Sequence, residues 1–504
     1  MQPKDGLEKE PFAFTLKRIG VLDIGSNSVR LVIYEIYGAA FTPIYNEKVL
    51  AGLGRDLKTT GRLHVAGAKM ALTALKRFKL LTDALGLDKV LIAATAALRD
   101  AQDAGAFITQ VKADTGFDIK PLSGETEAYM TAMGVIAGDY RARGLVADLG
   151  GASLEFMSIE NGKAGTGVSY PLGPFSMFKD MFTPQDLKHR ILDILKGSSL
   201  GVKGKTLYLI GGAWRNLALI HQKNIGYPLR VAHNYKLEPN AAKTLARWAY
   251  SDKGAQTFGS INSLSKRRAD TLPYSGLMLE ILLDKLQPFQ VILAPGGLRE
   301  GLVFNALDPK TQSRNALFDA CRALALGNQK AIRFSTPLYN FLYQASSIFP
   351  KAFESKNENR LRMAACLLVG IGKGFHPAHK AKLVFRTIIS APLPDLTHKE
   401  RAYLALILYT SYTSKSATPN DAAIGILLSE EERLSARIYG QAMRAGVVLS
   451  GRSRTILSKF KLAKTASALS LQVEAGFDAL FSGQSLSHVY SFEKLSNINV
   501  HIIK

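Results

Sequence analysis

The feature that most constrains the fold of this chain is a short pattern that occurs twice. Residues 23–28 read Asp-Ile-Gly-Ser-Asn-Ser, and residues 148–153 read Asp-Leu-Gly-Gly-Ala-Ser. Apolar residues precede each copy, at 19–22 and 145–147, and a second strand-like run follows each, at 29–36 and 154–159. Each copy therefore predicts a β-hairpin with an acidic residue beside its glycine-containing turn. An offset of 125 residues is too long for a solenoid repeat and indicates two related domains.

The sequence around these hairpins predicts a mixed α/β fold. Residues 89–101, 206–218 and 290–304 each read as a strand that turns into a helix. Residues 62–87 predict a helix with Ala71, Leu72, Leu75, Phe78 and Leu81 on one side. From about residue 310 the pattern is mostly helical, with loops expected at 353–359 and 413–421. We expect an N-terminal tail at 1–17, α/β domains at 18–138 and 139–309, and a basic helical domain at 310–504.

The net positive charge of the chain favours negatively charged partners. The chain has 504 residues, with 64 Lys and Arg against 41 Asp and Glu, and 14 of its 23 net positive charges fall after residue 309. Such a field attracts polyanions, whether polyphosphate, nucleotides, nucleic acid or an anionic membrane, although a merely solvated basic surface explains the charge equally well.

Targeting and redox signals favour the cytoplasm. The first 18 residues do not resemble a signal peptide, and the most apolar run, residues 402–409, is too short to span a bilayer. Two cysteines, Cys321 and Cys366, form no disulfide framework. We therefore expect a cytoplasmic protein without a membrane span.

Glycine-containing turns after strands are candidate anion sites, because backbone N–H groups can converge there without obstruction by a Cβ. Four such turns occur, at 25–28, 150–153, 211–212 and 296–297. One of them alone would be ordinary turn chemistry. Asp23, Asp148 and Glu155 are candidate ligands for Mg²⁺, which prefers oxygen donors. The alternatives are a turn-capping role for Asp148 and a solvent-facing position for Glu155.

Residues 121–136 predict a helix that carries a candidate general base. Ser123 is a plausible N-cap, and one apolar face is expected to contain Tyr129, Ala132, Met133 and Ile136. Glu125 and Glu127 are two residues apart, so they cannot point the same way, and only one is expected to face a cleft. Both acids could instead simply decorate the start of a helix. Thr95 and Arg99 lie four apart at another helix start, where an arginine suits a phosphate oxygen, and Arg299 after Gly297 is similar. The alternative for both arginines is an exposed helix residue that binds no ligand.

Together these motifs resemble the exopolyphosphatase and guanosine pentaphosphate phosphohydrolase family. The resemblance rests on the patterns at 23–28, 95–99, 123–128, 148–155 and 297–301, and covers about residues 18–310. It implies two ribonuclease-H-like, actin-like domains with an interdomain cleft, followed by a mostly α-helical HD-like domain. It also implies an Mg²⁺-dependent hydrolase.

The resemblance assigns roles by position. Glu127 would be the catalytic base, and Asp148 and Glu155 would hold Mg²⁺ with Asp23 nearby. The residues expected to bind phosphate are Gly25, Ser26, Asn27, Ser28, Arg30, Thr95, Arg99, Gly150, Gly151, Ala152, Ser153, Gly211, Gly212 and Arg299.

The chain also departs from the family pattern. Ala152 replaces a usual third glycine, Leu154 a frequent threonine, and Trp214 with Arg215 stands where small polar residues are common. In the HD-like region the metal-binding His-Asp pair would fall on Val369 and Gly370, so no catalytic metal is expected there. His376 and His379 are expected to be structural or surface groups.

The resemblance favours an exopolyphosphatase that releases orthophosphate from inorganic polyphosphate. The alternatives are hydrolysis of guanosine pentaphosphate to the tetraphosphate, and a non-catalytic sensor of polyphosphate or alarmone. A kinase is disfavoured because no sugar-recognition pattern is found. We expect a homodimer that binds neither membrane nor specific nucleic acid.

Overall fold

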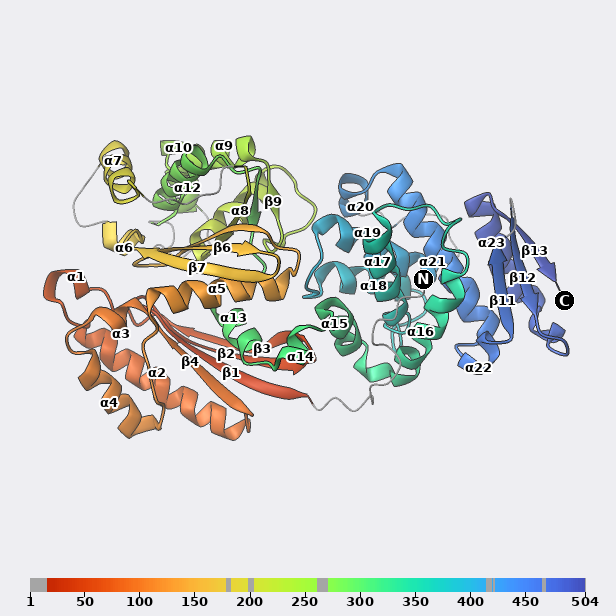
Figure 1. The fold of residues 1–504 in the computed structure, drawn as a ribbon, viewed down its shortest axis with the longest axis horizontal. Helices are drawn as coiled ribbons and strands as arrows, with labels where there is room; N and C mark the ends of the chain where they lie inside the picture. The colour runs from red at the N-terminus through yellow and green to blue at the C-terminus, as the bar shows by residue number, and fades with distance from the viewer. Residues whose placement is uncertain are drawn as a thin grey trace. The chain divides into compact units, whose positions relative to one another are not determined.

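The computed structural model describes residues 16–177, 183–197, 204–260, 271–413, 419, 422–464 and 468–503. Most of the predicted tail at 1–17 and of the predicted loop at 413–421 therefore lies outside the described residues. The chain divides into two compact units (Figure 1). Unit 1 comprises residues 1–225 and 231–316, and unit 2 comprises residues 226–230 and 317–504.

Unit 1 begins with a four-stranded sheet in the order β3-β2-β1-β4. Its strands are β1 (Lys17–Ile24), β2 (Val29–Tyr37), β3 (Ala40–Val49) and β4 (Lys89–Ala94). Its helices are α1 (Leu57–Thr60), α2 (Val65–Ala84), α3 (Ala96–Asp100) and α4 (Ala104–Thr115). Helix α2 buries Ala71, Leu75 and Phe78 against this sheet, with Leu72 and Leu81 partly buried, so the predicted apolar side is confirmed.

A six-stranded sheet follows, in the order β7-β6-β5-β8-β10-β9. Its strands are β5 (Gly144–Leu149), β6 (Leu154–Glu160), β7 (Lys163–Tyr170), β8 (Thr206–Ile210), β9 (Lys236–Leu237) and β10 (Gln290–Leu293). The helices of this part are α5 (Gly124–Gly138), α6 (Pro174–Met177), α7 (Pro184–Ile194), α8 (Gly212–Asn224), α9 (Pro239–Ala249), α10 (Asp252–Ser260), α12 (Leu272–Leu286), α13 (Leu298–Asn305) and α14 (Pro309–Gln312).

The two sheets repeat one topology. In each, an antiparallel hairpin is extended by a third antiparallel strand on one side and by a parallel strand on the other. The hairpins β1-β2 and β5-β6 are those predicted from the repeated motif, and the predicted strand-to-helix units are β4-α3, β8-α8 and β10-α13. The repeat seen in the sequence is therefore a repeat of structure.

Helices α5 and α13 connect the two sheets of unit 1. Helix α5 packs on β6 and β7 of the second sheet, while α13 packs on α5 and contacts β1 and β4 of the first (Figure 1). Glycines allow the two helices to approach closely, because a Cβ on Gly301 would lie 1.6 Å from the carbonyl oxygen of Met130. The predicted apolar face of α5 is partly wrong. Tyr129 is exposed, and the helix instead buries small residues such as Ala128 and Gly134.

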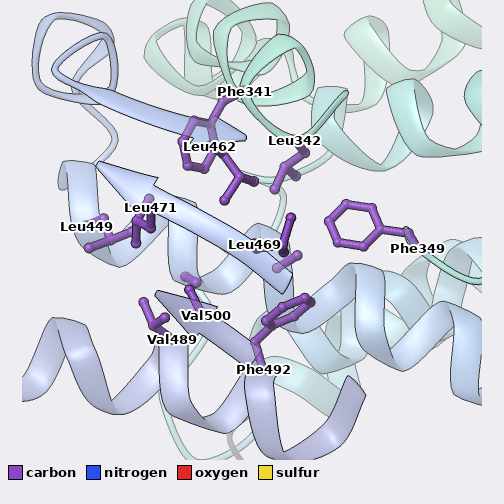
Figure 2. Close-up of a pocket in the computed structure, with 12 residues that line it drawn as sticks. Phe341, Leu342, Phe349, Leu449, Leu462, Leu469, Leu471, Val489, Phe492 and Val500 are labelled. Atoms are coloured by element: carbon purple, nitrogen blue, oxygen red, sulfur yellow. The ribbon is translucent and has the colours of Figure 1, made fainter. Parts of the chain in front are cut away.

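Unit 2 is helical with a small sheet at its end. Its helices are α15 (Ala316–Leu324), η1 (Leu326–Asn328), α16 (Gln329–Tyr343), α17 (Ser355–Leu367), α18 (Lys380–Ser390), α19 (His398–Ser411), α20 (Ala422–Leu427), α21 (Glu430–Ser450), α22 (Arg454–Leu457), η2 (Asp478–Leu480) and α23 (Gly483–Ser496). The strands β11 (Phe460–Lys464), β12 (Ala468–Val473) and β13 (Asn499–Ile503) form the sheet, which the sequence reading missed. Figure 2 shows apolar side chains of this sheet meeting those of α16, α21 and α23 around a small pocket.

The loop predicted at 353–359 is also wrong, because α17 begins at Ser355. Its polar residues build buried ion pairs rather than a solvated loop. Glu358 pairs with Arg362 one turn later, at 2.9 Å, and both side chains are almost fully buried. Among the described helices, none is long and apolar enough to cross a bilayer.

Candidate functional site

The two repeated turns have the same backbone geometry. The N–H of Gly25 donates to the carbonyl oxygen of Ser28 at 2.9 Å, and the N–H of Gly150 donates to that of Ser153, also at 2.9 Å. Each turn therefore closes in the same way at the end of the first strand of its sheet. The predicted pair of matched turns is confirmed.

A second pair of segments braces these turns, and the sequence reading missed it. After β3, the N–H groups of Gly52 and Gly54 donate to the carbonyl oxygens of Asn27 and Ser26. After β7, the N–H groups of Gly173 and Phe175 donate to those of Ala152 and Gly151. The available signal was a glycine that follows the third strand in both halves, at 52 and 173.

The cross-strand partners of the two repeated aspartates differ in charge. Asp23 lies opposite Arg30 in the first hairpin, and Asp148 lies opposite Glu155 in the second. Arg30 also donates from Nε to Oδ1 of Asn46 at 2.7 Å. Equivalent positions thus pair an acid with a base in one sheet and two acids in the other. Glu155 is 3 % exposed, so the alternative of a solvent-facing residue is wrong.

Helix α5 presents Glu127 to this region and leaves Glu125 exposed. Ser123 caps the helix as predicted, its hydroxyl accepting from the N–H of Thr126. Nη1 of Arg99 donates to Oε2 of Glu127 at 3.3 Å. One of the two acids faces inward, as their spacing required, and it meets the arginine that follows β4.

Burial raises the pKa of four carboxylates in this region, and the charges of other carboxylates in this set raise the pKa of three of them further. Burial raises the pKa of Glu127, and the charge of Asp148 raises it further, against the opposing effect of Arg99. Burial and the charge of Glu155 raise the pKa of Asp148, and burial with the charge of Glu127 raises that of Glu155. Burial also raises the pKa of Asp23, although Arg299 and Arg30 oppose it. The protein alone leaves this negative charge incompletely compensated.

These carboxylates fit a hard divalent cation. Among the described residues, no three His, Cys, Asp or Glu side chains are arranged to enclose a metal ion. A cation held by Asp148 and Glu155 would therefore need water and substrate oxygens to complete its shell, which is how Mg²⁺ is usually bound. The chemistry of the donors, buried acids that repel one another, suits such an ion.

Two polar groups near the turns have no partner within the described chain. They are Oδ1 of Asn27, in the first turn, and Nη1 of Arg299, at the start of α13. Nε of Arg299 lies 3.8 Å from Oδ2 of Asp23. A buried donor or acceptor without a partner is costly, and a ligand can supply the missing partner.

Three other predicted residues, Thr95, Gly211 and Gly212, lie at the ends of strands. Thr95 is buried beside the first turn, and its N–H donates to the carbonyl oxygen of Ile24 at 3.1 Å. Gly211 has a φ of 126°, and a Cβ there would lie 2.6 Å from the carbonyl oxygen of Leu149. Gly212 begins α8. Leu154 and Trp214, which depart from the family pattern, belong to the core, and the Trp214 indole donates to the carbonyl oxygen of Ser275 at 2.9 Å.

In unit 2, Val369 and Gly370 stand at the positions where the resemblance places a His-Asp pair. Val369 is buried, and Gly370 packs on Ala331. His376 and His379 are exposed, with ring centroids 5.8 Å apart. Their surface position agrees with the expectation from the sequence.

Comparison with known proteins identifies the family. Residues 32–310 match the Ppx/GppA phosphatase family, and residues 317–503 match the exopolyphosphatase C-terminal domain. The chain is 25% identical over 429 residues to retrograde regulation protein 2 of Saccharomyces cerevisiae, covering 77% of this chain and 71% of that one. It is 26% identical over 335 residues to exopolyphosphatase 1 of Mycobacterium tuberculosis, covering 63% and 96%. The crystal structure of the Aquifex aeolicus Ppx/GppA family member matches with a TM-score of 0.50 and 25% identity, over 57% of this chain and 97% of that one.

The first family model spans more than half of the chain, and the two sheets of unit 1 share one hairpin topology. The chain belongs to the Ppx/GppA phosphatase family. It is accordingly a phosphoanhydride hydrolase with an actin-like first unit.

Proposed function

We propose that this protein is an exopolyphosphatase that releases orthophosphate from the end of inorganic polyphosphate, with Mg²⁺ as cofactor and Glu127 as general base. The observation that carries the proposal is the inward position of Glu127 in the buried carboxylate cluster, beside Arg99. Hydrolysis of guanosine pentaphosphate is the second candidate, because the motifs that carry the family resemblance do not separate the two activities.

Glu127 has the properties of a base for water. Burial and the charge of Asp148 raise its pKa, which favours proton acceptance near neutral pH. The contact with Arg99 holds the carboxylate of Glu127 in place. The Glu127 side chain is only 14% exposed. Glu127 would orient a water for in-line attack on the terminal phosphorus and take its proton.

The surrounding residues would bind the phosphate chain. The turns at 25–28 and 150–153 would offer backbone N–H groups, and Arg30, Arg99 and Arg299 would neutralise phosphate charge. Asp148 and Glu155 would hold Mg²⁺, with Asp23 nearby. When bound, the ion would offset the charge that develops on the transferred phosphoryl group. Catalysis would then rest mainly on positioning and electrostatics.

The test measures orthophosphate release with Mg²⁺ from long-chain polyphosphate and from guanosine pentaphosphate, in parallel. Glu127→Gln keeps the shape of the side chain but cannot accept the proton, so turnover should fall by at least about a hundredfold while substrate binding persists. Glu125→Gln is the matched control, because Glu125 is exposed and lies two residues before Glu127 on the same helix. It should leave turnover unchanged.

Each outcome is informative. Faster release from polyphosphate that Glu127→Gln abolishes supports the proposal. Release from the nucleotide alone would make the protein an alarmone phosphatase. Binding of both ligands without release would favour a regulatory sensor, and loss of activity in Glu125→Gln but not in Glu127→Gln would overturn the assignment of the base.

A further inference from the structure

The carboxylate of Glu300 has a hydrogen-bond donor on each oxygen. The hydroxyl of Tyr34, from β2, donates to Oε1 at 2.6 Å. The N–H of Gly297 donates to Oε2 at 2.9 Å, as part of the capping box that begins α13. Burial alone would raise the pKa of Glu300, but the charge of Arg299 and these two donors outweigh burial and lower it. Glu300 is therefore an ionised and fully engaged group.

The neighbouring residue Arg299 is engaged only loosely. Its Nε is 3.8 Å from Oδ2 of Asp23, and its buried Nη1 has no partner within the described chain. No hydrogen bond or ion pair joins Arg299 to Glu300 in the part of the chain that the structure describes. The guanidinium is thus left available although a carboxylate follows it directly in sequence.

The two observations are linked by the hydrogen-bonding needs of a buried carboxylate. If Oε1 of Glu300 lost its donor, the unmet acceptor would be costly, and a charged donor would relieve that cost best. Arg299 is the adjacent cation and has an unused N–H group. Removing the Tyr34 hydroxyl would therefore let Glu300 capture the guanidinium of Arg299.

We propose that Tyr34 is a positioning residue, which occupies Glu300 and so keeps Arg299 free to bind a phosphate of the substrate. This inference rests on the phosphate-binding role of Arg299 within the proposed function. The hydrogen bond from Tyr34 to Glu300 joins the first sheet to α13, the helix that follows strand β10 of the second sheet.

Tyr34→Phe tests the proposal with little other disturbance. The Tyr34 ring is buried and meets Phe41 edge-on, with centroids 5.8 Å apart, and phenylalanine keeps that packing. We expect the KM for polyphosphate to rise about tenfold, the loss of one charged phosphate contact, with kcat within about twofold. Tyr403→Phe is the matched control, since Tyr403 donates to buried Glu358 at 2.5 Å in unit 2. Tyr403→Phe should lower the thermal stability by an amount similar to that of Tyr34→Phe, without changing the KM for polyphosphate.

A second substitution separates positioning from mere structure. Glu300→Gln can still accept from Gly297 but cannot form an ion pair with Arg299. The double variant Tyr34→Phe, Glu300→Gln should therefore recover a KM within about twofold of wild type, and Glu300→Gln alone should also keep it there. A purely structural role for Tyr34 predicts no such recovery, so its absence would overturn the proposal.

Arg299→Gln distinguishes failure of this inference from failure of the proposed function. If Arg299→Gln raises KM but Tyr34→Phe does not, the positioning role is wrong and the phosphate contact stands. If Arg299→Gln leaves KM unchanged, the proposed phosphate-binding role of Arg299 is wrong, and the positioning role is overturned with it.

Discussion

At the scale of single residues, the site depends on a difference between two matching positions. Arg30 and Glu155 occupy equivalent places opposite the repeated aspartates, so one hairpin pairs an acid with a base and the other pairs two acids. Repetition of the fold alone would make both turns alike. The charge opposite the aspartate therefore differs in sign between the two hairpins, and only the second hairpin pairs two carboxylates.

Stability of the metal-free protein should fall as pH rises. In Glu127, Asp148 and Glu155 the folded-state pKa is raised, so the folded chain holds more protons than the unfolded chain above the ordinary carboxyl pKa. The stabilisation is present below about pH 4.5 and is lost as pH rises toward about 7. Glu155→Gln removes one of these carboxylates. The free energy of unfolding that the variant loses as pH rises should therefore be smaller than the wild-type loss by on the order of 1–3 kcal/mol.

Urea unfolding in EDTA at about pH 5 and about pH 8 measures this difference between wild type and Glu155→Gln. Added Mg²⁺ should restore wild-type stability at the higher pH and have little effect on the variant. Parallel pH dependence in the two proteins would show that the carboxylates do not interact as described.

At the scale of elements, local pattern predicted the hairpins, the strand-to-helix units and the Ser123 cap, because each is determined by neighbours in sequence. The errors arose where distant contacts decide. Residues 353–359 read as a loop because Glu358 and its polar neighbours find their partners in other helices, such as Glu400 and Tyr403. The bracing segments, which the sequence did not predict, likewise depend on the assembled sheets, and so does the choice between the two alternatives for Glu155.

The contact between α5 and α13 should be intolerant of added atoms. A Cβ on Gly301 would lie 1.6 Å from the carbonyl oxygen of Met130, so Gly301→Ala must separate the helices that carry Glu127 and Arg299. We expect destabilisation of about 1–3 kcal/mol, or more, and a large loss of turnover. Gly105→Ala is the control, because a Cβ there meets no atom within 4 Å and alanine favours the helix by up to about 1 kcal/mol.

Urea unfolding and orthophosphate release on both variants decide the point. Equal stability and activity of Gly301→Ala and wild type would mean that the helices do not approach as closely as described.

At the scale of the whole molecule, the chain joins a site-bearing unit to a basic one. The first family model ends at residue 310, and a separate model, that of the exopolyphosphatase C-terminal domain, matches residues 317–503. Here the residues after 309 hold 14 of the 23 net positive charges. Such a field increases the local concentration of a polyanion without determining the chemistry of the site.

The salt dependence of KM should therefore grow with substrate length. Salt screens exposed charges that are more than about 10 Å apart, so a long polyphosphate that follows the basic unit should lose more affinity than tripolyphosphate, which is short enough to contact the site alone. Between about 50 and 200 mM KCl we expect the KM for long chains to rise at least roughly threefold more than that for tripolyphosphate. Steady-state orthophosphate release at fixed free Mg²⁺ measures both constants, and Arg99→Gln should raise both by a similar factor because that residue belongs to the proposed site. An equal salt dependence for the two substrates would mean that the basic unit does not contact the chain, and its charge would then be a solvated surface.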